Sequence, residues 1–259
     1  MNTPLSHANS RVKEARKLSR RSVRTERRLF LADGPKAVEG ALTVPGCVVE
    51  VFATVAAAEQ YAALLVDVPQ LWLVEDRAMD SLSDSVSPAG VVAVCRFLDV
   101  DLADVLSSSP RLVTVCADVR DPGNAGTVIR TSDAAGAQAV VLAGHSVDPY
   151  NPKTVRASVG SLFHLPVVLV DDPGQVVRAL QEAGLTVLAA DGAGEVDLFD
   201  ADLAPATAWL FGNEAWGLPD ELAALADHRV SIPIHGSAES LNLATAAAVC
   251  LYASARAQR

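Results

Sequence analysis

The sequence predicts an α/β protein with two domains, and two patterns carry this prediction. From residue 111 onward, short apolar runs alternate with helical stretches, which indicates strands of a parallel sheet covered by helices on both faces. Between residues 29 and 97 the same alternation is shorter, which predicts a small α/β/α domain. We therefore expect a basic arm or helix at 1–28, a small domain at 29–97, a linker at 98–110 and a larger domain at 111–259.

The small domain is predicted from four apolar runs separated by helical patterns. The turn residues Asp33, Gly34 and Pro35 end the first run and open a helix. Strands are expected at 29–31, 48–52, 70–74 and 91–95, and helices at 10–29, 35–42, 55–65 and 76–82. The linker is acidic and ends in Ser-Ser-Ser-Pro, with a short helix expected at 102–106.

The larger domain is predicted from a regular succession of strands and helices. Strands are expected at 112–117, 139–142, 167–170, 186–190, 208–211 and 230–232. Helices are expected at 125–135, 152–162, 173–183, 218–225 and 241–256. No internal repeat is visible.

Composition excludes several classes of protein. Half of the 259 residues are hydrophobic, enough for a sizeable core, and no apolar run is long enough to span a membrane. The four cysteines are far apart in apolar segments, as expected of core residues in a reducing cytosol. Five scattered histidines form no ligand cluster, so we expect no metal site. The cysteine pattern leads us to expect a cytoplasmic protein.

The N-terminal segment differs in charge from the rest of the chain. Residues 1–30 hold nine Lys and Arg against two Glu, a net charge of +7, whereas the other 229 residues carry −17. A basic segment on an acidic body is typical of polyanion binding, although a solvated helix remains an alternative and a targeting peptide is disfavoured. The expected RNA contacts here are Arg11, Lys13, Arg16, Lys17, Arg20, Arg21 and Arg24.

A first motif follows the strand at 112–117. Pro122 and Gly123 predict a sharp turn, and Asn124 is suited to cap the next helix. Arg130 lies six residues further on, near enough to the helix N-terminus to help bind a phosphate there. Alternatively, Arg130 only pairs with Asp133 on the helix surface.

Two further loops leave the ends of predicted strands near the C-terminus. The first contains Gly212, Asn213 and Glu214, and the second ends in residues 240–242, where a helix begins. Loops at the carboxyl ends of parallel strands are where open α/β sheets bind ligands, so a pocket is expected. No Rossmann or Walker fingerprint is present, and the Gly-x-Gly at 192–194 is interpreted as a turn. Taken singly, each loop is also compatible with an ordinary capped corner.

Together the three motifs resemble a known family. Residues 118–136 (DVRDPGNAGTVIRTSDAAG), 211–218 (FGNEAWGL) and 232–249 (IPIHGSAESLNLATAAAV) closely resemble the three signature motifs of the SpoU/TrmH family. Those proteins are RNA ribose 2'-O-methyltransferases of the SPOUT superfamily that use S-adenosylmethionine. Residues 24–34 and 88–94 more weakly resemble the family's N-terminal substrate-binding domain, which has a ribosomal-protein-L30e-like fold; Asp33 replaces the usual glutamate there.

The resemblance implies a C-terminal trefoil knot, a homodimer formed through the catalytic domain, and a structured RNA substrate, ribosomal ahead of transfer RNA. It assigns the chemistry to Arg130, Asn124, Glu214 and Asn242. The implied cofactor-binding residues are Phe211, Gly212, Asn213, Ile232, Ile234, Ser240, Leu241, Asn242 and Leu243. Lys153 and Arg156 are expected to face the RNA. The rival hypotheses are a catalytically silent RNA-binding protein of this fold and a small-molecule-binding α/β protein.

Overall fold

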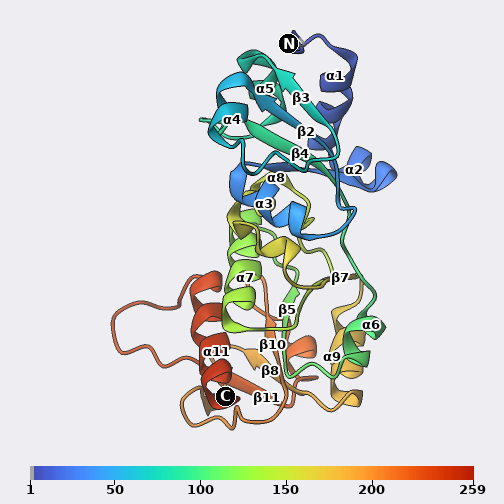
Figure 1. The fold of residues 1–259 in the computed structure, drawn as a ribbon. Coiled ribbons are helices and arrows are strands. Elements are labelled where there is room, and N and C mark those ends of the chain that lie inside the picture. Colours follow the sequence, from blue (N-terminus) through green and yellow to red (C-terminus); the bar gives the residue numbers. More distant parts are fainter. Residues whose placement is uncertain (1–2) are drawn as a thin grey trace. The chain divides into compact units, whose positions relative to one another are not determined.

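The computed structural model describes residues 3–259, which form two compact units (Figure 1). Of the described residues, the smaller unit comprises 3–98 together with 148–164, and the larger unit comprises 99–147 and 165–259. Residues 148–164 therefore come from the middle of the larger unit's sequence but fold with the smaller unit. The acidic segment at 99–110, predicted to be a linker, belongs to the larger unit.

The smaller unit is built on a mixed four-stranded sheet of order β1-β4-β2-β3, in which only β2 and β3 are parallel. Its elements are α1 (Ser10–Arg16), η1 (Lys17–Ser19), α2 (Arg21–Arg27), β1 (Leu29–Asp33), α3 (Pro35–Thr43), β2 (Val48–Thr54), α4 (Val55–Gln60), β3 (Leu71–Val74), α5 (Asp76–Leu82), β4 (Val91–Arg96), α8 (Pro152–Ser158) and η2 (Ser161–Phe163). One sheet face packs on α1, η1 and α5, whose Val12, Leu18 and Met79 are buried in one cluster with Phe52.

The segment at 148–164 covers part of the sheet of the smaller unit. The ring of Tyr150 stacks on Phe97, with the centroids 3.9 Å apart, and lies 4.7 Å from the ring of Phe30. A Cβ at Gly40 in α3 would lie 2.9 Å from the Phe163 ring and 3.0 Å from the Gly160 carbonyl, so this approach requires glycine. The segment is thus packed closely against β1 and α3.

The larger unit is built on a seven-stranded parallel sheet of order β7-β6-β5-β10-β8-β11-β9. Its elements are α6 (Leu102–Ser107), β5 (Leu112–Ala117), α7 (Pro122–Ala135), β6 (Ala139–Ala143), β7 (Val167–Val170), α9 (Pro173–Glu182), β8 (Thr186–Ala190), β9 (Val196–Asp197), β10 (Thr207–Phe211), α10 (Asp220–Ala223), β11 (His228–Ser231) and α11 (Leu243–Ala257). α7 and α11 cover one face and α6 and α9 the other (Figure 1). This confirms the predicted parallel-sheet α/β fold, while the knot remains a prediction.

Several predicted helices differ from those observed. The helix expected at 10–29 is interrupted at Arg20, whose backbone is extended, because Arg24 donates hydrogen bonds to the carbonyls of Leu18 (3.0 Å) and Ser19 (2.8 Å). The helix expected at 152–162 ends at Ser158, where Val159 adopts the left-handed conformation (φ 52°). The helix expected at 55–65 ends at Gln60 and continues as turns.

The start of α7 also differs from the prediction. The N-cap is Asp121, whose Oδ1 accepts a hydrogen bond from the Asn124 backbone N–H at 2.8 Å, and Pro122 occupies the first helical turn. Asn124 therefore lies inside the helix, and its side chain is available for contacts other than capping. α11 begins at the expected loop of residues 240–242, and its N-cap is Asn242.

Candidate active site

The loop after β10 is a tight, rigid turn. The backbones of Asn213 and Gly217 exchange two hydrogen bonds of 2.9 Å, and a Cβ at Gly212 would lie 2.3 Å from the Gly217 carbonyl carbon. Only glycine fits at position 212. The buried Asn213 side chain donates to the carbonyl of Asp118 (2.7 Å) at the end of β5 and accepts from the Ala215 N–H (2.8 Å). This loop is thereby fastened to the neighbouring strand end.

Glu214 connects the same loop to the N-terminus of α7. Its carboxylate accepts hydrogen bonds from the backbone N–H groups of Arg120 (3.2 Å) and Asp121 (3.0 Å) and from the side-chain amide of Asn124 (3.3 Å). Negative charge is favoured at this position, because the first N–H groups of a helix lack partners and the helix dipole is positive there.

Asn242 joins the third loop to this arrangement. Its Oδ1 accepts from the backbone N–H groups of Ala244 (2.9 Å) and Thr245 (3.3 Å), which caps α11, and its Nδ2 donates to Oδ1 of Asn124 (3.1 Å). A continuous chain of hydrogen bonds thus runs from Glu214 through Asn124 to Asn242. The structure brings together three of the four residues to which the resemblance assigns the chemistry, one from each motif, and we call them the polar triad.

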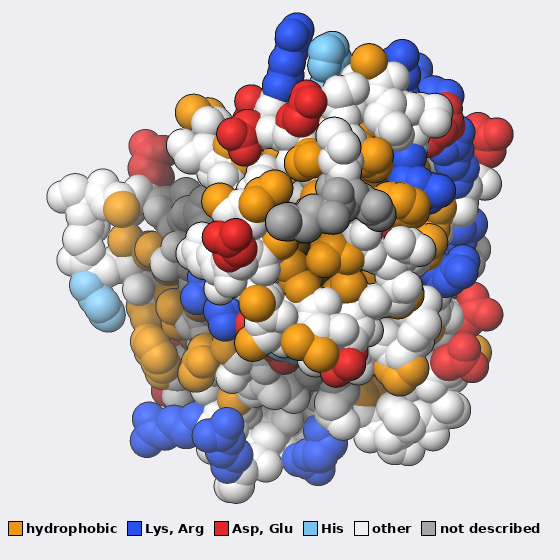
Figure 2. Space-filling view, turned by 45° about the horizontal axis from the view of Figure 1, so that its top comes forward, with side chains coloured by type: hydrophobic (Ala, Val, Ile, Leu, Met, Phe, Trp, Pro, Cys, Tyr) orange, Lys and Arg blue, Asp and Glu red, His pale blue; other side chains and the backbone are white. Residues whose placement is uncertain are grey.

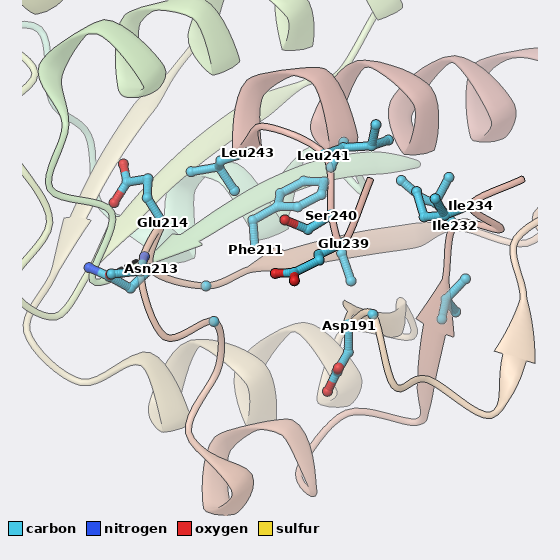
Figure 3. A pocket seen from close by; sticks show the side chains of 17 residues that line it. Asp191, Phe211, Asn213, Glu214, Ile232, Ile234, Glu239, Ser240, Leu241 and Leu243 are labelled. Atoms are coloured by element: carbon cyan, nitrogen blue, oxygen red, sulfur yellow. Dashed lines mark hydrogen bonds between the residues drawn. The ribbon is translucent and has the colours of Figure 1, made fainter. Parts of the chain in front are cut away.

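A cavity of about 310 Å³ lies beside the polar triad at the carboxyl ends of β8, β10 and β11. Figure 3 shows Phe211 between Leu241 and Leu243, with Ser240 and Glu239 beside its ring and Asn213 and Glu214 together at one end. The lining residues are Ala190, Asp191, Gly192, Phe211, Gly212, Asn213, Glu214, Ala215, Gly217, Val230, Ile232, Ile234, Glu239, Ser240, Leu241, Leu243 and Ala246. All residues expected to bind the cofactor line it except Asn242, which caps α11 beside it.

The cavity wall carries negative but no positive side chains. Asp191, Glu214 and Glu239 line it, and none of the described lining residues is Lys or Arg. Asp191 is partly neutralised, because Arg229 donates to its Oδ2 through Nη2 (2.8 Å) and Nε (3.1 Å). Such a wall is poorly suited to the phosphates of a dinucleotide and well suited to a ligand that carries positive charge.

Sequence reasoning missed the contribution of β8 to this cavity. Asp191 and Gly192 were interpreted as part of a turn, and they do form one, in which the Gly194 N–H donates to the Asp191 carbonyl at 2.9 Å. They line the cavity because β8 is the sheet neighbour of both β10 and β11. Strand order is the signal that was missing, and no local pattern around residue 191 encodes it.

Arg130 is not part of the polar triad. It is exposed on α7, about 9 Å further along the helix axis than Asn124 and on a different side of the helix. Within residues 3–259 no ion pair or hydrogen bond holds its guanidinium, so the alternative of an Arg130–Asp133 pair is not observed. Arg130 is therefore available to a phosphate that approaches α7.

The cysteine beneath the site is chemically inert. Cys116 in β5 is fully buried, and burial, together with the negative charge of Glu214, raises the pKa of its thiol to about 12. A thiol with this pKa stays protonated at neutral pH and is a weak nucleophile. This excludes Cys116 as a covalent catalyst.

The expected RNA contacts in the N-terminal helices fall into two groups. Figure 2 shows Lys and Arg side chains along one edge of the face in view, with Asp and Glu among them. Three of the seven expected RNA contacts are ion-paired: Arg11 with Glu50 at 2.8 Å, Lys17 with Glu14, and Arg24 with Asp148 at 2.6 Å. The remaining four are exposed: Lys13, Arg16, Arg20 and Arg21.

Arg24 is not accessible to RNA. Its side chain is only 2% exposed, and besides Asp148 it binds the carbonyls that end η1. Arg156, also expected to face RNA, pairs with Asp33 (3.6 Å) and Asp84 (3.4 Å), so its charge is largely neutralised within the smaller unit. Lys153 is exposed near the start of α8.

Two features are absent from the described part of the chain. No helix in residues 3–259 is long and apolar enough to cross a membrane. No group of three or more His, Cys, Asp or Glu side chains in the same range is arranged to hold a metal ion.

The parallel sheet, with an acidic cavity and the polar triad at its carboxyl edge, defines an α/β protein with a site suited to a ligand that carries positive charge. The model of the SpoU rRNA Methylase family matches residues 111–252, and that of the MRM3-like substrate binding domain matches residues 9–93. The chain belongs to the SpoU rRNA methylase family.

Relatives cover nearly the whole chain. The 23S rRNA (guanosine(2553)-2'-O)-methyltransferase RlmP of Bacillus subtilis (strain 168) is 34% identical over 94% of this chain and 95% of its own length. An AdoMet-bound rRNA methyltransferase from Sinorhizobium meliloti has a TM-score of 0.86 and 34% identity, covering 98% of this chain and 97% of that one. The SpoU methyltransferase AviRb from Streptomyces viridochromogenes, in complex with AdoMet, has a TM-score of 0.82 and 35% identity, covering 96% and 98%. The predicted family, the enzyme class and S-adenosylmethionine as cofactor are confirmed.

Proposed function

We propose that this protein transfers a methyl group from S-adenosylmethionine to a ribose 2'-hydroxyl of 23S ribosomal RNA. The observation that carries the proposal is the polar triad, in which Glu214, Asn124 and Asn242 are hydrogen-bonded in sequence beside an acidic cavity. The relatives named above support ribosomal RNA as the substrate.

The cavity fits the cofactor in volume and in chemistry. Its size lies at the lower end of the range for ligand pockets, and Phe211, Ile232 and Leu241 offer apolar surface for an adenine ring. Glu239 and Asp191 supply negative charge for the sulfonium and amino groups. Bound there, S-adenosylmethionine supplies a methyl group already activated for transfer.

The polar triad aligns the reacting groups. The Glu214 carboxylate receives three hydrogen bonds, so its role is to hold the start of α7 against the loop after β10 and not to remove a proton. Asn124, held at both ends of its amide, fixes the distance between that helix and the start of α11. Rigid alignment of this kind can contribute several kcal/mol to a transfer reaction.

Arg130 acts on the RNA side of the reaction. Its guanidinium is exposed and unpaired among the described residues, so it can bind the phosphate beside the target ribose. The same positive charge stabilises the negative charge that develops on the ribose oxygen as its proton leaves.

Four features of the protein remain predictions: the trefoil knot, a homodimer formed through the catalytic domain, a cytoplasmic location and the domain boundaries. The long apolar helix α11, with Tyr252 exposed on it, is compatible with a dimer contact.

The proposal is tested with unmodified transcripts and labelled S-adenosylmethionine. The protein should methylate a 23S rRNA transcript, and digestion of the product should yield one 2'-O-methylated nucleoside. Methylation of a tRNA transcript alone would replace ribosomal by transfer RNA as the substrate. Tight RNA binding without methylation would favour the silent RNA-binding protein.

Cofactor binding is tested separately by calorimetry. Because the cavity is formed by the larger unit alone, S-adenosylmethionine should bind in the absence of RNA. The variant Leu241→Asp should bind S-adenosylmethionine at least about tenfold more weakly than the wild-type protein. The substitution places a charge in the apolar wall that is expected to hold the adenine. If the wild-type protein showed no heat of binding with S-adenosylmethionine, a silent RNA-binding protein or a protein that binds another small molecule would be favoured.

A further inference from the structure

Trp216 is unlike the other two tryptophans of the chain. Trp209 is fully buried, and its indole N–H donates to Ser254 Oγ at 2.8 Å. Trp72 donates its N–H to Glu50 at 2.9 Å and stacks under Arg11. Trp216 is 57% exposed, and among residues 3–259 its N–H has no acceptor. Such a large exposed apolar ring with a free donor contributes little to the stability of the fold.

The backbone holds Trp216 at the edge of the active site. It lies in the tight turn closed by Asn213 and Gly217, and its neighbours Ala215 and Gly217 line the cavity while Trp216 does not. The turn is fastened to the end of β5 through Asn213, so the backbone that carries the indole is held in place before any ligand binds.

The guanidinium of Arg120 lies over this indole. The Cζ atom of Arg120 lies 5.2 Å from the centroid of the Trp216 ring, which is the range of a cation–π contact. No carboxylate among the described residues pairs with this guanidinium, since Glu214 binds only the backbone N–H of Arg120. The guanidinium therefore keeps its full positive charge beside a largely exposed indole.

We propose that Trp216 and Arg120 form a stacking platform for an unpaired base of the RNA substrate, next to the ribose that is methylated. This inference rests on the proposed function. Bases released from a helix stack on aromatic rings and on arginine planes, and a nearby guanidinium also attracts the adjoining phosphate. The platform adjoins the polar triad, because the backbone N–H of Arg120 donates to Glu214 and Trp216 follows Glu214 by two residues in the same tight turn.

Kinetics with a 23S rRNA transcript test the platform. Trp216→Ala should raise KM for the RNA between about 5-fold and about 100-fold, the loss expected for one base–aromatic stack, with little change in kcat. Trp216→Phe should recover most of the loss. Arg120→Lys should recover only part of the loss seen in Arg120→Ala, because lysine keeps the charge that attracts the phosphate but lacks the planar group. The calorimetric affinity for S-adenosylmethionine should stay unchanged in all four variants.

Phe199→Ala is the matched control, since Phe199 is an exposed aromatic residue (69%) of the same unit outside the site. It should leave KM at the wild-type value. An unchanged KM in Trp216→Ala would overturn the platform, as would a change in its sedimentation, which would make Trp216 a contact between protein copies. A loss of cofactor affinity would also overturn it, by showing that the indole only supports the loop.

Tryptophan fluorescence separates this inference from the proposed function. Stacking on the indole should quench emission when the 23S transcript is added, and Trp216→Phe should lose that part of the quenching whereas Phe199→Ala keeps it. A wild-type protein that fails to methylate the transcript contradicts the proposed function only. Quenching that is undiminished in Trp216→Phe contradicts the platform whether or not methylation occurs.

Discussion

The polar triad and the N-terminal helices are both rich in polar side chains, but these side chains have different partners in the two regions. In the triad, one carboxylate is held by two backbone N–H groups and one amide, and no cation among the described residues neutralises it. In α1, η1 and α2, Glu14 takes hydrogen bonds from both Lys17 and Arg27, and Arg24 is buried against Asp148. Polar groups in the first region position loops, whereas many in the second neutralise one another.

The difference shows what a net charge can and cannot indicate. The sum of +7 over residues 1–30 counts Arg24 and Lys17 as fully as Arg16. Spatially, Asp148 and Glu50 lie outside that segment but cancel part of its charge. A motif of fixed spacing predicts which side chains converge, while a charge count does not predict which charges remain unpaired.

The largest expected effect is a loss of stability when the ion pair between Arg24 and Asp148 is broken. Arg24→Met should destabilise the protein by about 3–5 kcal/mol, because it leaves the carboxylate of Asp148 partly buried without its partner. Urea unfolding followed by circular dichroism measures this loss. The exposed Arg16→Met is the control and should change stability by less than about 0.5 kcal/mol. Equal unfolding midpoints for the two variants would show that Arg24 is no more structural than Arg16.

The second effect is a loss of methyltransferase activity with no loss of stability. Arg130→Ala should lower kcat for RNA methylation about 10²–10³-fold, as expected for the loss of one group that stabilises developing charge, with an unchanged Tm. Arg178→Ala on α9, another exposed arginine of the same unit, should keep full activity. A parallel loss of activity and Tm in Arg130→Ala would assign it a structural role instead.

The smallest effect is on the salt dependence of RNA binding, and it compares exposed with ion-paired basic residues of the N-terminal helices. Exchanging the exposed Arg16, Arg20 and Arg21 together for Gln should lower the slope of log K against log salt by at most about 2, because each of these arginines can neutralise one phosphate. Lys17→Gln should have a smaller effect per residue, because Lys17 already pairs with Glu14. Filter binding of the 23S transcript at several salt concentrations measures both slopes. An unaltered slope in the triple variant would mean that these helices do not contact RNA.

Deletion of residues 1–28 is a poor test of the same question. Val12, Ala15 and Leu18 are buried against β2 and α5, so removing them exposes the core of the smaller unit. Weaker RNA binding after such a deletion would report unfolding as much as lost charge.

The sequence predicted the buried elements of the larger unit well. The strands at 112–117, 167–170 and 186–190 are observed with the predicted bounds, because continuous apolar runs between turns are typical of a covered parallel sheet. The break at Arg20 could not be predicted, since Arg24 binds the carbonyls of Leu18 and Ser19 while it is also held by Asp148, 124 positions away.

The candidate site was predicted to a similar degree. The three motif residues of the triad were identified by spacing and resemblance, but the assignment of Asn124 as a cap was wrong because Asp121 and Pro122 already begin the helix. The roles of Asp191 and Trp216 depend on the strand order and on a side chain's exposure, and neither leaves a local pattern in the sequence.

The chain passes between its two units at residues 98–99, 147–148 and 164–165, which complicates any attempt to dissect the enzyme. A fragment that starts at residue 99 retains the crossing segment but strips it of β1 and α3, leaving Tyr150 and Phe163 facing water. An autonomous catalytic fragment therefore requires a short loop in place of residues 148–164. For the same reason, replacing the smaller unit by another RNA-binding domain requires two segments to be exchanged, residues 3–98 and residues 148–164.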